Sequence, residues 1–399
     1  MQKLSFILLI TVGFVINACW KSQEPRPDDP LSFMSLSAKK MESSVDITIT
    51  ALVHKGTIGP QSTSFEEAEI YISEETPNTM KLSYTTKATT LKLTNLEADK
   101  IYYLAAKGTK NGQKTELSEP IMISTRSLKS LETITENTCS PNTKSSVDSP
   151  YWAYSLSCGL SSTSNNDEIW VENRLTKTKK MIHKNSSSKH YFVKGFYNEG
   201  KIIILETTQN KERAFDYYDI ATEKFVNIEI PADARVWNYA FSPDGTKLAY
   251  TGYNKQGLYI YDTKTKEDKL FSTDYFYDFD WSRDGKTIVQ LRNKPNVSSD
   301  IKELIKYKLS TEGQKTEQLL EWNDLGIQWL SLSPKEEYIL FASYVANSND
   351  LWIYEIKTGK VWQISNVNNF GWLSDKEFFA NINKAANEST WKTVKYRMP

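Results

Sequence analysis

The sequence predicts an all-β protein that is divided into two β-domains, and three observations carry this prediction. Aromatic residues make up 12% of the 399 residues, and they include 22 tyrosines and 11 tryptophans, which are enriched in strands. Short segments alternate apolar and polar residues with a period of two, the pattern of a strand with one buried face. Turn sequences rich in Gly, Pro, Asn and Asp separate these segments.

The charge balance and the rare residue types exclude several classes of function. The chain has 49 Lys and Arg against 49 Asp and Glu, so it lacks the basic surplus of a nucleic-acid-binding protein. Three His and three Cys leave little material for a metal site or a His-based catalytic site. The motifs Gly-x-Ser-x-Gly, Walker A, His-Glu-x-x-His and Cys-x-x-Cys do not occur in the sequence. We therefore expect no enzymatic activity, no cofactor, no metal and no nucleic-acid partner.

The first 19 residues have the pattern of an export signal that ends in a cysteine. Lys3 supplies the positive charge, and the apolar run 4–16 is too short to span a membrane as a mature helix. The sequence Ile-Asn-Ala-Cys at 16–19 resembles the processing site of bacterial lipoproteins. This resemblance implies removal of residues 1–18, a lipid on Cys19 and a membrane anchor in the bacterial cell envelope, at the outer membrane. An ordinary secretory signal that contains a cysteine is the alternative.

The residues after the signal are expected to be a tether followed by exported β-domains. Residues 19–30 are charged and rich in Pro, which is typical of a flexible linker. Export also bears on Cys139 and Cys158, which remain as a pair in a compartment that permits disulfides once Cys19 is acylated. A disulfide and two buried thiols are both open interpretations of this pair.

Residues 31–126 are predicted to form a β-sandwich. Period-two segments lie at 45–52, 68–73 and 80–84, and Asn-Gly at 111–112 predicts a hairpin turn with positive φ. Leu96 followed by Tyr102, alternating strand residues and that turn resembles a fibronectin type III module. The resemblance implies a tyrosine corner, in which the Tyr102 hydroxyl is bonded to the backbone a few residues upstream.

Residues 128–399 contain a repeat. Ser-Pro-Asp-Gly at 242–245 is followed by an apolar strand, and related segments occur at 281–289, 332–340 and 372–379. A second set of strands carries Tyr218, Tyr261, Tyr307 and Tyr354, which recur at a period of about 45 residues. Each repeat predicts a four-stranded meander that cannot bury both faces alone. Six such sheets arranged radially would bury one another, which is a six-bladed β-propeller.

The last repeat shows three strands, at 367–373, 377–383 and 390–397. We expect the segment 131–136, which precedes the first repeat, to add the fourth strand and close the ring. Ser-Pro-Asp-Gly followed by Leu-Ala-Tyr resembles the repeat of TolB-type propellers. This resemblance implies a non-enzymatic scaffold that binds envelope proteins through one face of the propeller.

The binding face follows from the topology of a four-stranded blade. Loops between blades gather at one mouth of the channel with the loops between second and third strands, and loops carry function. These loops mix aromatic, amide and charged residues, as protein-binding and glycan-binding surfaces do. The expected binding face consists of His190, Arg235, Trp237, Tyr275, Tyr277, Trp322, Asp324 and Tyr344. A surface glycan-binding lipoprotein is the alternative function, and ordinary loops with incidental aromatics are the structural alternative.

Asp278 and Asp280 lie one pleat apart on one face of a predicted strand. Two neighbouring carboxylates can serve general acid–base chemistry, which would suit a degenerate hydrolase or lyase. The interpretation that we favour is structural, with both carboxylates accepting hydrogen bonds from backbone groups near the channel.

Overall fold

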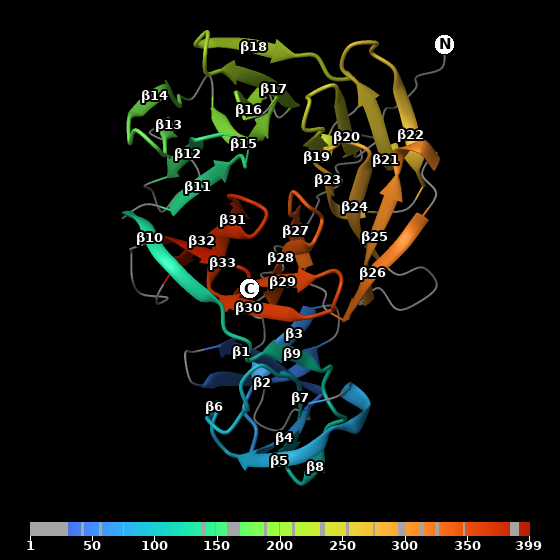
Figure 1. Ribbon diagram of the computed structural model, residues 1–399. Helices are drawn as coiled ribbons and strands as arrows, with labels where there is room; N and C mark the ends of the chain where they lie inside the picture. The colour runs from blue at the N-terminus through green and yellow to red at the C-terminus, as the bar shows by residue number, and fades with distance from the viewer. Residues whose placement is uncertain are drawn as a thin grey trace, which may run out of the picture.

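The computed structural model in Figure 1 describes residues 31–40, 44–55, 58–74, 76–137, 140–147, 149–157, 168–186, 190–198, 200–209, 212–231, 236–252, 255–273, 276–293, 301–311, 315–323, 327–345, 348–383 and 391–399. These residues form strands and two 3₁₀ turns, η1 (Pro77–Thr79) and η2 (Leu309–Thr311). Within these ranges, no helix is long and apolar enough to cross a membrane. The predicted all-β class is confirmed.

The N-terminal domain is a sandwich of two antiparallel sheets. One sheet contains β1 (Phe33–Lys40), β2 (Val45–Lys55), β3 (Ile58–Thr63) and β6 (Thr90–Leu93). The other contains β4 (Glu67–Ser73), β5 (Lys81–Thr86), β7 (Ile101–Lys110), β8 (Gln113–Lys114) and β9 (Ile121–Ser124). Alternate residues such as Ile47, Ile70 and Leu104 point inward from both sheets into one core.

Two local features of the sandwich follow from the sequence. The Tyr102 hydroxyl accepts a hydrogen bond from the backbone N–H of Glu97 at 2.8 Å, as the tyrosine corner predicts. Asn111 and Gly112 have φ of 52° and 74° in the turn between β7 and β8. A two-sheet sandwich is what the structure shows, and its assignment to the fibronectin type III family stays a prediction.

The C-terminal domain is a β-propeller of six four-stranded sheets, called blades 1 to 6 here. Blades 1 and 2 contain β11 (Ser140–Ser145), β12 (Tyr151–Ser157), β13 (Glu168–Asn173) and β14 (Lys179–Lys184), then β15 (Tyr191–Tyr197), β16 (Ile202–Gln209), β17 (Glu212–Asp219) and β18 (Lys224–Ile228). Blades 3 and 4 contain β19 (Val236–Phe241), β20 (Lys247–Gly252), β21 (Lys255–Asp262) and β22 (Asp268–Ser272), then β23 (Phe276–Trp281), β24 (Thr287–Asn293), β25 (Ile301–Lys308) and β26 (Lys315–Asn323). Blade 5 contains β27 (Ile327–Leu332), β28 (Tyr338–Val345), β29 (Ser348–Glu355) and β30 (Val361–Ser365).

Blade 6 combines the two ends of the propeller sequence. It contains β31 (Val367–Trp372), β32 (Glu377–Asn383), β33 (Trp391–Arg397) and β10 (Lys129–Asn137). Strand β10 pairs antiparallel with β33, so the segment expected at 131–136 lies inside this added strand. In Figure 1 the first strands of the blades, β11, β15, β19, β23, β27 and β31, gather round the centre of the propeller.

The repeated turns form because one serine hydroxyl caps each of them. Ser242 Oγ accepts the backbone N–H of Lys247 at 2.9 Å, and Ser282 Oγ accepts that of Thr287 at the same distance. Gly245 adopts a φ of +71° in this turn, a region that favours glycine. Blade 5 keeps the serine and places Glu336 at a φ of 57° instead.

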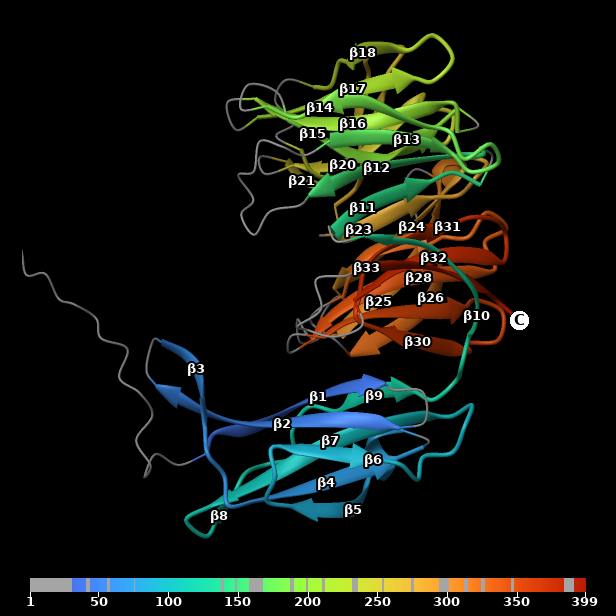
Figure 2. The same ribbon diagram turned by 90° about the vertical axis from the view of Figure 1, so that its left-hand side faces the viewer.

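The sandwich packs against blade 5. The Ser124 hydroxyl of β9 donates to the Val361 carbonyl of β30 at 2.8 Å, and the Ser124 N–H donates to Gln363 Oε1 at 3.1 Å. The Lys40 N–H donates to Ser365 Oγ at 3.2 Å. Figure 2 shows β1 and β9 below β30, where these bonds form. The link between the domains is short, and the domains lie in contact.

Candidate functional site

The inner strands of five blades carry the same irregularity. The pairing of each with the second strand of its blade shifts register close to the start of the inner strand, the geometry of a β-bulge. The extra residues are Lys194, Trp237, Tyr277, Trp329 and Asn368. Neighbouring inner strands run parallel, since Asp278 bonds Leu330 and Asp280 bonds Leu332. The bulges therefore lie at one mouth of the channel.

Bulges re-aim side chains and are common beside functional sites. Trp329 is 48% exposed and has a φ of 53°. A positive φ is rare for a bulky residue, and the surrounding structure must maintain this backbone conformation. Trp329 is absent from the binding face expected from the sequence, because no local sequence pattern predicts a β-bulge.

Lys194 is held at the same mouth by groups of two blades. Its ammonium lies 3.0 Å from Glu206 Oε2, and the Tyr239 hydroxyl of blade 3 donates to the same carboxylate. The Lys194 ammonium also lies 5.8 Å from the centroid of the Tyr239 ring, within cation–π range. The bulge residue of blade 2 is thereby tied to blade 3.

Asp278 and Asp280 connect blade 4 to blade 5. Asp278 Oδ2 accepts the Leu330 N–H at 2.7 Å, and Asp280 Oδ2 accepts the Leu332 N–H at 2.9 Å. Asp280 Oδ1 also accepts the N–H of Trp281 at 2.8 Å. The favoured sequence interpretation, that both carboxylates satisfy backbone groups, is confirmed.

The surroundings of these carboxylates shift their titration. Burial raises the pKa of Asp278 to about 7 and that of Asp280 to about 6, and the backbone hydrogen bonds oppose this rise. Lys144 of blade 1 interacts electrostatically with both, and burial lowers the pKa of Lys144 to about 8. Charged groups from blades 1 and 4 thus share the channel. In the ranges that the structure covers, no cluster of His, Cys, Asp and Glu is placed to hold a metal ion.

The structure describes little of the binding face expected from the sequence. The His190 ring contacts the Phe192 ring at a centroid distance of 4.6 Å. Trp237 and Tyr277 are the bulge residues of blades 3 and 4. The side chains of Trp237, Tyr277, Trp322 and Tyr344 lie outside the described residues, as do Arg235, Tyr275, Asp324, Cys19, Cys139 and Cys158 in full. The face and the disulfide stay predictions.

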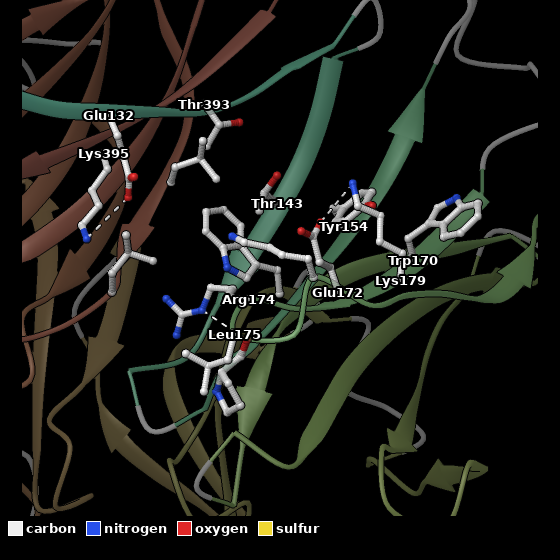
Figure 3. A pocket seen from close by; sticks show the side chains of 15 residues that line it. Glu132, Thr143, Tyr154, Trp170, Glu172, Arg174, Leu175, Lys179, Thr393 and Lys395 are labelled. Carbon is white, nitrogen blue, oxygen red and sulfur yellow. Dashed lines mark hydrogen bonds and ion pairs between the residues drawn. The ribbon is translucent and has the colours of Figure 1, made fainter.

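A second site lies at the seam between blades 1 and 6, where the structure has a cavity of about 650 Å³. Figure 3 shows Glu132 and Lys395 of blade 6 on one side and Tyr154, Glu172 and Lys179 of blade 1 on the other. Its lining is Glu132, Ile134, Thr143, Pro150, Trp152, Tyr154, Trp170, Glu172, Arg174, Leu175, Lys177, Lys179, Leu373, Thr393 and Lys395. The cavity volume is that of a small-molecule site.

No family model matches this sequence, and no curated protein matches it. Among solved structures, TolB from Acinetobacter baumannii is 14% identical, with 84% of this chain and 79% of that chain covered and a TM-score of 0.43. The Cps50 (Swd1) β-propeller domain of Myceliophteria thermophila is 11% identical, with 67% and 99% covered and a TM-score of 0.45. An oligogalacturonate lyase in complex with manganese is 10% identical, with 75% and 83% covered and a TM-score of 0.46. These likenesses concern the fold alone.

The lyase corrects one expectation from the sequence, namely that the protein is not an enzyme. An enzyme has a similar fold, so an enzymatic activity is compatible with this architecture. The expectation was wrong because it rested on the scarcity of His and Cys. Asp, Lys and Tyr side chains also serve as catalytic groups, and the propeller supplies all three.

Proposed function

We propose that this protein is a lipid-anchored scaffold of the bacterial cell envelope that binds a protein partner at the bulged mouth of its propeller channel. The observation that carries the proposal is the recurrence of a bulge in five inner strands, with Lys194 and Trp329 among the extra residues. A half-exposed Trp is typical of a protein-binding hot spot. The lipid anchor rests on the sequence at 16–19.

The contacts among the described residues of this mouth support the proposal. Asp278 and Asp280 hold the inner strands of blades 4 and 5 together, and Glu206 holds Lys194. A preorganised surface loses less conformational entropy on binding than a mobile one. The described part of the mouth therefore offers a partner inner strands that are already held in place.

Photo-crosslinking in intact cells tests the proposal. A photoreactive amino acid at position 194 or 329 should capture one and the same protein, identified by mass spectrometry. The matched control is position 270, because Leu270 is 49% exposed on β22, the strand of blade 3 at the opposite edge of the sheet from the inner strand β19. Equal capture at position 270, or repeated recovery of this protein alone, would contradict the proposal.

The glycan-binding alternative makes a different prediction at the same surface. Affinity electrophoresis in a panel of polysaccharides should retard the protein, and Trp237→Ala, Trp322→Ala or Trp329→Ala should abolish the retardation. Unchanged mobility in every polysaccharide, together with capture of a protein at position 329, favours the scaffold.

A further inference from the structure

The seam cavity exists because blade 1 departs from the other blades at one position. In five blades the penultimate residue of the third strand is a buried tyrosine, 1–8% exposed, that contacts the preceding blade: Tyr218, Tyr261, Tyr307, Tyr354 and Tyr396. Register identifies the equivalent residue of blade 1 as Glu172, which pairs with Trp152 as Tyr218 pairs with Ile203. A carboxylate thus stands where a phenol ring fills each other interface.

The packing at the seam is correspondingly sparse. Among the described residues, the apolar cluster between blades 6 and 1 has three buried members, Trp152, Leu373 and Phe379. The cluster between blades 5 and 6 has thirteen. Protein interiors are normally close-packed, so a cavity of about 650 Å³ at this interface indicates a site that can hold a ligand.

The charges of the lining favour an anion. Four basic and two acidic side chains line the cavity. Lys179 lies 3.2 Å from Glu172, and Lys395 lies 3.7 Å from Glu132 and 2.9 Å from Glu377, so each lining carboxylate already has a lysine. Among the described residues, Arg174 and Lys177 have no carboxylate partner. The Arg174 guanidinium donates to the backbone carbonyls of Ser146, Ser149 and Pro150 and keeps its positive charge. Desolvation lowers the pKa of Arg174, as expected for a cation that is partly withdrawn from water.

The aromatic residues of the lining, Trp152, Tyr154 and Trp170, are called the aromatic wall, and they supply flat apolar surface. Trp152 is 7% exposed and packs on Phe379 at a centroid distance of 5.3 Å. The Arg174 guanidinium lies 5.7 Å from the centroid of the Trp152 ring. In the described part of the chain, the Trp152 indole N–H is buried without a hydrogen-bond partner. Leaving such a donor unsatisfied costs about 1–3 kcal/mol.

Polar groups around the aromatic wall favour a ligand with hydroxyls. Thr143, Tyr154 and Thr393 bring hydroxyls to the lining, and Glu132 and Glu172 bring acceptors. A carboxylate repels an anionic group but accepts hydrogen bonds from a hydroxyl. The lining carboxylates therefore favour a ligand that has hydroxyls and carries its negative charge on one group. A sugar ring offers C–H groups to an aromatic face and hydroxyls at its rim.

We propose that the seam pocket binds a sugar unit that carries one anionic group. The ring lies against the aromatic wall, the anionic group lies near Arg174 and Lys177, and hydroxyls bond the lining carboxylates. This binding site lies between blades 1 and 6 and is separate from the bulged mouth proposed to bind a protein partner, so either proposal can fail alone.

Titration calorimetry on the full-length protein tests the pocket, with glucuronate, glucose 6-phosphate and glucose as probes. We expect at least one anionic sugar to bind tenfold or more tightly than glucose and to raise the melting temperature. Tighter binding of glucuronate would identify the anionic group as a carboxylate, and tighter binding of glucose 6-phosphate would identify it as a phosphate. Equal affinity for glucose, or no binding of either anionic sugar, would overturn the proposal.

Variants of the lining locate the binding. Glu172→Tyr places the residue of the other five blades in the cavity and should abolish binding while raising the melting temperature. Should this variant fail to fold, Lys177→Gln should still weaken anionic sugar binding severalfold with unchanged melting. Its matched control is Lys266→Gln, since Lys177 and Lys266 occupy the same turn position at φ of 60° and 64°. An equal effect of both lysine variants, or unchanged binding in Glu172→Tyr, would contradict the site.

Discussion

Asp280 of blade 4 accepts the backbone N–H of Leu332 in blade 5 at 2.9 Å, a hydrogen bond that joins residues 52 positions apart. Asp278 accepts the neighbouring N–H of Leu330. Both N–H groups lie on the inner edge of β27, whose other edge pairs with β28. These two carboxylates therefore accept backbone N–H groups at a blade boundary, as the carbonyls of a neighbouring strand do within a sheet.

Removal of this acceptor should destabilise the propeller. In Asp280→Ala the N–H groups of Leu332 and Trp281 lose their acceptor. The free energy of unfolding should fall by about 1–3 kcal/mol, measured by denaturant titration. Asp375→Ala is the control, because Asp375 makes a surface ion pair with Lys335 and should change stability little. Equal loss in both variants would refute the role of Asp280.

The raised pKa values of Asp278 and Asp280 predict a pH dependence of stability. Both folded-state values, about 7 and about 6, lie above the ordinary value of 3.8. The folded state thus binds more protons than the unfolded state between pH about 4 and about 7, so these groups lower the unfolding free energy as pH rises through that window. The folded-state pKa of Lys144, about 8, lies below the ordinary value of 10.5, so this group raises the unfolding free energy as pH rises between about 8 and about 10.5.

The double variant Asp278→Asn/Asp280→Asn isolates this effect. The amides keep an oxygen acceptor but do not titrate, so the unfolding free energy of the variant should depend less on pH between 4 and 7 than that of the wild-type protein. Chemical denaturation at a series of pH values measures both slopes. Identical slopes would exclude these carboxylates as the source.

The Tyr102 hydroxyl should contribute to the stability of the sandwich. Tyr102→Phe removes the acceptor of the Glu97 N–H and should lower the unfolding free energy by about 1 kcal/mol. Tyr103→Phe is the matched control, since the described structure gives the Tyr103 hydroxyl no hydrogen bond. A larger loss in the control would argue against a tyrosine corner.

The contact between the domains should couple their unfolding. Gln363→Ala removes the acceptor of the buried Ser124 N–H and the donor to Asp350 Oδ2. We expect the sandwich and the propeller to melt at more widely separated temperatures in calorimetry than in the wild-type protein. The control is Ser83→Ala, on the exposed strand β5 of the sandwich. An unchanged separation would show that other contacts carry the coupling.

The lipid anchor is testable in cells. Labelled palmitate should be incorporated into the protein and Cys19→Ala should abolish the label, because the acyl chains are attached to that residue. Cys158→Ala is the control for a cysteine outside the signal. Label that survives Cys19→Ala would rule out this anchor.

The strands, the turns and the repeat could be predicted from the sequence because they depend on local chemistry. The serine-capped turns at Ser242 and Ser282 and the positive φ at Gly245 arise within a few residues of chain. The resemblance to a fibronectin type III module pointed to Tyr102, whose hydrogen-bond partner lies only five residues away. The spacing of the repeated segments along the chain also predicted six blades.

The sites depend on contacts between distant segments, and these were decided by the tertiary structure. Trp329 is exposed because β27 shifts its register against β28. The N–H groups that Asp278 and Asp280 accept come from the next blade. The seam cavity requires β10 and β33 to lie beside blade 1, whose Glu172 is too small to fill the space that a tyrosine fills elsewhere. Local sequence patterns set the strands, whereas the space between two blades is set by side chains that lie far apart along the chain.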